Sequence, residues 1–191
     1  MELQQINVKF FVDGPLGVAP EHFINVFHKW IREEAFDELL VDVADYRHVP
    51  EGPGVMLIGL EADYSMDHTD GRWGLRYNRK AELPGTNADR FTQALRAAAT
   101  ACQSLEAEFA SGDPLKFHRQ EFELFVNDRA VAPNTDETFA ACRKDLDAFL
   151  TAALGHSDYS LSRPDDPRRR FGVLVTSKKP FDLDRFASAV Q

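Results

Sequence analysis

Charged and polar residues gather on one side of an expected β-hairpin, where they could bind a polar ligand. The pair Asp70-Gly71 predicts a two-residue turn, because both residue types tolerate positive φ there. Pairing outward from this turn puts Thr69 opposite Arg72. The polar side then carries Glu61, Asp63 and Ser65 facing Lys80, Asn78 and Arg76, and the apolar side carries Tyr64, Met66 and His68 facing Tyr77, Leu75 and Trp73. A slip of one residue would mix these sets, so their separation supports the register.

The polar side of this hairpin suits a zwitterionic or anionic ligand. Its charges are mixed, and Arg76 offers a planar, two-pronged donor for a carboxylate or phosphate. We therefore expect a small polar ligand at Asp42, Glu61, Asp63, Arg76, Asn78 and Lys80, with Asp42 included if its strand lies alongside. Opposite charges across a hairpin also occur as ordinary sheet-stabilising pairs, which contribute about 0.2–1 kcal/mol each. Both interpretations stay open.

The segment 45–54 is a second candidate site. Two glycines and two prolines give it a shaped turn that lets a ligand or another chain approach the backbone. His48 lies close in sequence to Asp45 and could form an acid–base pair with it. With Glu61 and Asp63, these two residues are our candidate catalytic groups. The spacing fits no metal-binding motif, so no metal site is expected, and a rigid connector with a surface histidine explains the same residues.

Composition and charge narrow the classes of partner. The chain has 191 residues and a formal net charge of −9, which disfavours binding to nucleic acid. The basic run 168–170 stands beside two aspartates and is interpreted as a solvated loop. No signal peptide and no membrane-spanning stretch is expected. Cys102 and Cys142 fall on apolar helical stripes, which predicts buried free thiols and a cytoplasmic location.

The hydrophobic pattern predicts alternating strands and helices. Strands are expected at 6–12, 39–43, 55–60, 122–126 and 171–175, in addition to the hairpin and a short strand near Tyr159. Helices are expected from Pro20, over 88–109, from a capping box at Asn134 and Glu137 to Gly155, and after Asp182.

The two halves of the chain resemble each other in short segments that keep their order. The segments 11–13, 18–20, 45–46, 54–55 and 89–91 match 125–127, 131–133, 158–159, 172–173 and 184–186. We therefore predict a single α+β domain over 1–191, with a mainly antiparallel sheet covered by helices. An internal pseudo-duplication of a βαββα unit would make two pseudo-repeats, at about 1–110 and 114–191, that share one sheet. Helices on one face would leave the other face for a second subunit, which favours a homodimer.

Two stretches, 42–55 and 61–80, resemble an uncharacterised family of bacterial hypothetical proteins, and the likeness runs through most of the chain. The resemblance implies no activity, cofactor or substrate. Relatives in this resemblance carry a histidine where this chain has Leu60, which argues against a metal role near Glu61.

Two functions from different classes fit the sequence. The first is a non-catalytic domain that binds a ligand or a protein partner through the hairpin and the 45–54 loop. The second is a small-molecule enzyme that uses Asp45, His48, Glu61 and Asp63 for acid–base chemistry. The chain has no phosphate-binding glycine loop, CxxC pair, HExxH motif or nucleophile elbow. The sequence does not decide whether the protein is an enzyme, and any cofactor stays unknown.

Overall fold

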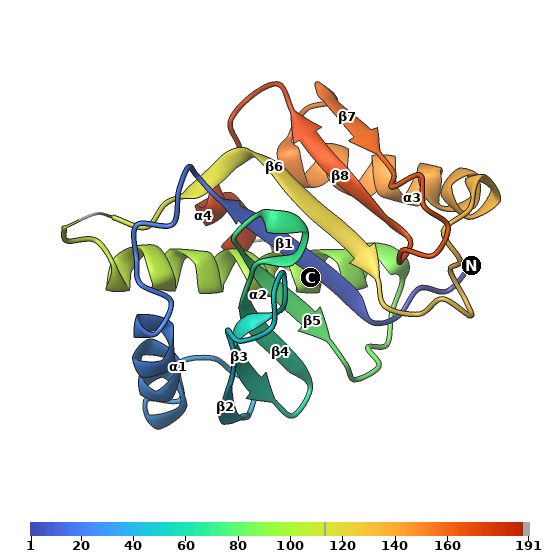
Figure 1. Ribbon diagram of the computed structural model, residues 1–191. Helices are drawn as coiled ribbons and strands as arrows, with labels where there is room; N and C mark the ends of the chain where they lie inside the picture. Colours follow the sequence, from blue (N-terminus) through green and yellow to red (C-terminus); the bar gives the residue numbers. More distant parts are fainter. Residues whose placement is uncertain (113, 189–191) are drawn as a thin grey trace.

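The protein forms an antiparallel sheet of eight strands, seen in the computed structural model of Figure 1, which describes residues 1–112 and 114–188. The strand order is β2-β3-β4-β5-β1-β6-β8-β7, so the strands of both halves share one sheet. The strands are β1 (Ile6–Val12), β2 (Leu40–Tyr46), β3 (Gly54–Gly59), β4 (Ala62–Asp67), β5 (Gly74–Arg79), β6 (Phe117–Val126), β7 (Tyr159–Ser162) and β8 (Gly172–Ser177). The helices are α1 (His22–Arg32), α2 (Asn87–Glu108), α3 (Asp136–Leu154) and α4 (Leu183–Ala187).

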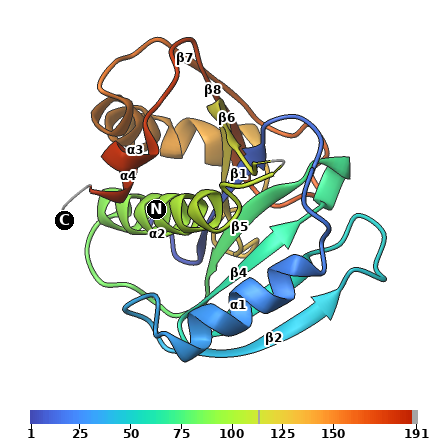
Figure 2. The ribbon, with the colours of Figure 1, turned by 90° about the vertical axis from the view of Figure 1, so that its left-hand side faces the viewer.

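The helices lie on one face of the sheet and leave the other face without a helix; in Figure 2, α2, α3 and α4 lie toward the left and α1 lies at the lower centre. Helix α1 covers β2 and β3, α2 covers β1 and β5, and α3 and α4 lie against α2. The α+β class, with an antiparallel sheet covered by helices, is therefore confirmed. We call the opposite surface of the sheet the helix-free face.

Strand β1 shows how alternation separates the two faces. Val8 and Phe10 are fully buried against the helices, where Phe10 contacts Phe122 with ring centroids 5.4 Å apart. Asn7 and Lys9 point to the helix-free face but are also buried, because β1 lies in the middle of the sheet. The central strand thus places a lysine inside the protein.

The expected hairpin and its register are confirmed. Asp63 pairs with Asn78, and Ser65 pairs with Arg76. Asp70 and Gly71 both have positive φ, as the turn requires, and a short 3-10 turn over Thr69–Gly71 joins the strands.

The start of α3 differs from the prediction. The residue that caps the helix is Thr135, whose hydroxyl accepts a hydrogen bond from the Thr138 backbone amide at 3.2 Å, so the predicted capping box at Asn134 and Glu137 is wrong. The Asn134 side chain is used elsewhere, because it donates to the carbonyl oxygens of Pro164 and Asp166 at 2.9 Å each.

The internal duplication stays a prediction. The sheet places β8 beside β6 as it places β5 beside β1, and Gly172 faces Phe125 as Gly74 faces Phe11. This arrangement aligns β8 with β5, whereas the short sequence matches align it with β3.

Candidate functional site

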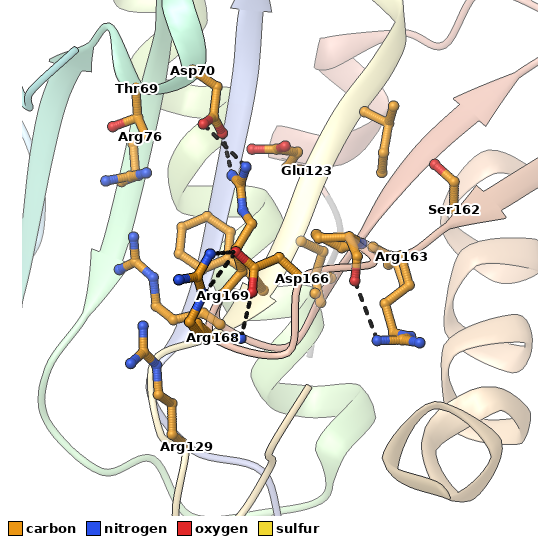
Figure 3. Close-up of a pocket in the computed structure, with 17 residues that line it drawn as sticks. Thr69, Asp70, Arg76, Glu123, Arg129, Ser162, Arg163, Asp166, Arg168 and Arg169 are labelled. Carbon is orange, nitrogen blue, oxygen red and sulfur yellow. Dashed lines mark hydrogen bonds and ion pairs between the residues drawn. The ribbon is translucent and has the colours of Figure 1, made fainter. Parts of the chain in front are cut away.

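The helix-free face carries a cavity of about 730 Å³ between the β4–β5 turn and the loop 163–171. Figure 3 shows the side chains that line it. Six of them are arginines: Arg76, Arg129, Arg163, Arg168, Arg169 and Arg170. Three lining residues are acidic: Asp70, Glu123 and Asp166. An acidic protein therefore concentrates positive charge in one place, which attracts anions.

Three of these arginines are each paired with a carboxylate. Arg169 donates from both terminal nitrogens to Asp70, which ties the loop 163–171 to the β4–β5 turn (Figure 3). Arg168 lies 3.0 Å from an Asp166 oxygen, and Arg163 lies 2.6 Å from Asp136. These pairs neutralise about half of the positive charge of the cavity.

The other three, Arg76, Arg129 and Arg170, do not each have a carboxylate of their own. Arg129 has no hydrogen bond or ion pair within residues 1–112 and 114–188. Arg170 donates to a neutral oxygen, Asn127 Oδ1, at 3.3 Å. Arg76 lies 2.9 Å from Asp67, but Lys9 shares that carboxylate, and Arg76 Nε is buried without a partner in the same described part of the chain. We call these three residues the arginine trio.

Two members of the arginine trio lie against one aromatic ring. The guanidinium carbons of Arg76 and Arg170 lie 5.1 and 4.8 Å from the centre of the Phe125 ring. Burial, followed by repulsion from Arg76, lowers the pKa of Arg170, and Arg129 and Arg169 add to this repulsion. Cations that repel one another in a half-buried position favour the binding of an anion.

A buried ion pair adjoins two residues that line the cavity, Arg76 and Glu123. Lys9 Nζ lies 2.7 Å from Asp67 Oδ1 and donates to the Thr69 carbonyl oxygen at 3.1 Å. Both side chains are almost fully buried, at 1% and 0% exposure. This pair fixes the start of the β4–β5 turn below the arginines.

Glu123 lies in the cavity wall directly across from Lys9 in the β1–β6 register. Burial raises the pKa of the Glu123 carboxyl, while the charges of Lys9, Arg76 and Arg169 lower it and the charge of Asp70 raises it.

Local structure explains how the chain brings these arginines together. Arg76 comes from β5, Arg129 from the segment after β6, and Arg170 from the residue that leads into Phe171 and β8. The buried Asn134 side chain anchors the loop 163–171 through its two carbonyl contacts and accepts a hydrogen bond from Arg163 at 2.9 Å.

The ligand site expected on the hairpin is largely occupied by its own pairs. Lys80 Nζ lies 2.7 Å from Asp63 and donates to the Gly59 carbonyl oxygen, while Glu61 pairs with Arg79 at 2.8 Å. Asn78 donates to Asp63 at 3.4 Å. These contacts match the sheet-stabilising interpretation of the charges.

Two members of the expected hairpin site lie elsewhere. Asp42 does not lie alongside Asp63, because β3 comes between β2 and β4, which separates the two residues by about 10 Å. Arg76 is the one residue of the expected set that lines the cavity. The expected hairpin site and the cavity thus share this one residue.

The expected acid–base residues are not brought together. His48 is exposed in the loop between β2 and β3. This loop lies near the end of β4 at Asp67, because the Gly52 carbonyl oxygen accepts a hydrogen bond from the His68 backbone amide. Glu61 precedes β4, whose two ends are roughly 17 Å apart. Side-chain and backbone hydrogen bonds from Arg47 lower the pKa of Asp45 to about 2, which makes this carboxylate a weak base.

Sequence reasoning missed most of the cavity. The solvated-loop interpretation holds for Arg168, which is 88% exposed, but is wrong for the half-buried Arg170. Arg129, Arg163 and Glu123 were not singled out. One signal was present: the segment 163–170 carries four arginines and two aspartates in a chain of net negative charge.

Other chemistry-bearing residues have structural roles. Cys102 and Cys142 are free and buried, as predicted, and burial raises the pKa of the Cys102 thiol well above its ordinary value. His156 Nδ1 accepts a hydrogen bond from the Asp158 backbone amide, so the neutral ring carries its proton on Nε2, which faces Ser177 Oγ at 3.5 Å. This tautomer cannot take a proton from the serine.

Residues 1–112 and 114–188 lack two kinds of feature. No group of three or more His, Cys, Asp or Glu side chains there could hold a metal ion. Among the helices of the same part of the chain, none is long and apolar enough to cross a membrane.

Comparison with protein-family models, with curated protein sequences and with solved structures gives no match for this chain. The resemblance to uncharacterised bacterial proteins therefore stays a prediction.

Proposed function

We propose that the protein is a non-catalytic binding domain whose ligand is a small organic anion with at least two negative charges. One observation carries the proposal: a cavity on the helix-free face holds six guanidinium groups against three lining carboxylates. The protein as a whole carries a net charge of −9, so the positive cavity runs against its overall charge.

The size and composition of the cavity support a small ligand. A volume of about 730 Å³ lies within the range of about 300–1,000 Å³ that small-molecule pockets occupy. Arginine binds carboxylates and phosphates through paired, charge-assisted hydrogen bonds. The −9 net charge disfavours a nucleic-acid backbone as the anion, because the surrounding surface repels it.

Binding is favoured over catalysis by the positions of the candidate catalytic residues. An enzyme using Asp45, His48, Glu61 and Asp63 would need these groups around one substrate, and His48 lies at the opposite end of the strands from Glu61. The arginine trio, by contrast, needs no rearrangement to bind an anion.

Isothermal titration calorimetry with citrate and with pyrophosphate, in low-salt buffer at pH 7.5, tests the proposal. We expect both anions to bind at one site and the affinity to fall when Arg129 and Arg170 are both changed to Gln. Arg143→Gln is the matched control, because Arg143 is a surface residue paired with Asp147 on α3 and lies outside the cavity. The proposal would be refuted if neither anion binds. It would also be refuted if the double variant and the control lose the same amount of affinity.

Three wider predictions remain proposals of the same kind. We propose a homodimer, which light scattering on the purified protein would detect. We also propose a cytoplasmic location, in keeping with the free Cys102 and Cys142 thiols. Finally, we propose that the two halves, about 1–110 and 114–191, arose by internal duplication.

A further inference from the structure

The six arginines divide into two groups with different roles. Arg163, Arg168 and Arg169 each have a carboxylate of their own, in Asp136, Asp166 and Asp70. Within the arginine trio only Arg76 pairs with a carboxylate, that of Asp67, which also pairs with Lys9. Anion binding should therefore concentrate at the trio, where Arg129 and Arg170 have no carboxylate partner among the described residues.

The members of the trio reach the cavity from three separate segments. Arg76 extends from β5, Arg129 from the segment after β6, and Arg170 from the end of the loop before β8. In Figure 3, Arg76 and Arg129 lie on the same side of the cavity, one above the other, and Arg163 lies on the opposite side. Arg76 and Arg129 therefore present their guanidinium groups from one side of the cavity, although they belong to different segments of the chain.

A phosphoryl group fits this arrangement better than a carboxylate does. A phosphate monoester has three acceptor oxygens that point in different directions and a charge of about −1.5 to −2 at pH 7. A carboxylate has two oxygens in one plane and a single charge, and it matches one arginine fork. Three guanidinium groups, of which only that of Arg76 is paired with a carboxylate among the described residues, match the group that has more oxygens and more charge.

The cavity is larger than a phosphoryl group alone requires. Its lining also includes Pro164, Leu174 and Ser162. These residues add apolar surface and one hydroxyl group to the cavity. This remaining space suits the organic part of a small molecule.

Resting on the anion-binding function, we propose that the ligand is a small phosphomonoester whose phosphoryl group binds between Arg76, Arg129 and Arg170. The rest of the molecule lies along Pro164 and Leu174 toward Ser162. Arg163, Arg168 and Arg169 shape the cavity through their own ion pairs.

The test compares two aromatic dianions of similar size, phenyl phosphate and phthalate, by calorimetry at pH 7.5 and low salt. We expect phenyl phosphate to bind about tenfold more tightly, as one additional charge-assisted hydrogen bond would give. Arg129→Gln should remove most of this preference. Because Arg129 makes no hydrogen bond or ion pair within the described residues, this variant should keep the circular dichroism spectrum and melting temperature of the wild type.

Arg163→Gln and Arg143→Gln complete the test and separate this inference from the broader function. Both should keep the preference for phenyl phosphate. If the wild type binds the two dianions with equal affinity and Arg129→Gln binds neither, the phosphoryl site is overturned and the anion-binding function stands. A preference that Arg163→Gln removes and Arg129→Gln leaves intact would also overturn it. No binding of either dianion would overturn both proposals.

Discussion

The Lys9–Asp67 ion pair should contribute strongly to stability, and Lys9→Met tests this contribution. The two side chains are 1% and 0% exposed, with Nζ and Oδ1 2.7 Å apart. Removing one partner of a buried ion pair typically costs about 3–5 kcal/mol, because the remaining charge is left without compensation. Asp67 would still keep Arg76 at 2.9 Å, so we expect the lower end, about 3 kcal/mol.

Urea denaturation followed by circular dichroism at pH 7 measures this change as a difference in the free energy of unfolding. Lys80→Met is the matched control: Lys80 also pairs with an aspartate at 2.7 Å, but its side chain is 38% exposed. The control should lose about 0–1 kcal/mol, as exposed pairs do. If Lys9→Met loses no more stability than the control, the buried pair does not stabilise the fold as expected and the reasoning is refuted.

Three further changes have predicted outcomes. The folded-state pKa of Glu123 is raised, so its contribution to stability is present at low pH and is lost as the pH rises through that pKa. Glu123→Gln should therefore stabilise the protein more at pH 8 than at pH 4, as measured by urea denaturation. An equal effect at both pH values would contradict this prediction. Asp70→Asn should free Arg169 and raise the affinity for pyrophosphate a few-fold in calorimetry, whereas an unchanged or lower affinity would count against Asp70 as a competing anion. Thr86→Ala should cost about 1 kcal/mol in urea melts, because it removes the capping box of α2, and no measurable loss would contradict it.

Local patterns were sufficient to predict most elements of the fold. The Asp70-Gly71 turn fixed the hairpin register, because the turn type determines which residues face each other. The prediction began β6 at Phe122, but the strand begins at Phe117. The polar run from His118 to Glu121 hides the alternation expected of a strand, so the sequence pattern missed these residues.

The cavity could not be predicted because it depends on strand order and on one long-range anchor. Lys9 and Glu123 face each other only because β1 pairs with β6, and alternation along a strand does not reveal its neighbour. Arg170 is half-buried because Asn134 holds the distant loop 163–171 in place. A run of charges alone suggests an exposed loop. In this protein, the sequence indicates which side chains share a face of a hairpin, and the tertiary fold decides which charges lack partners.

The most direct test of the central claim is the arginine side-chain Nε–Hε spectrum, recorded by NMR during titration with phenyl phosphate. The account predicts that the resonances of Arg76, Arg129 and Arg170 shift together, with Arg76 moving strongly because its buried Nε has no partner in the described structure. Arg47, which is paired with Asp45 at the surface, should stay in place. Shifts confined to surface arginines such as Arg47, or no shifts at all, would contradict the claim that the cavity binds anions.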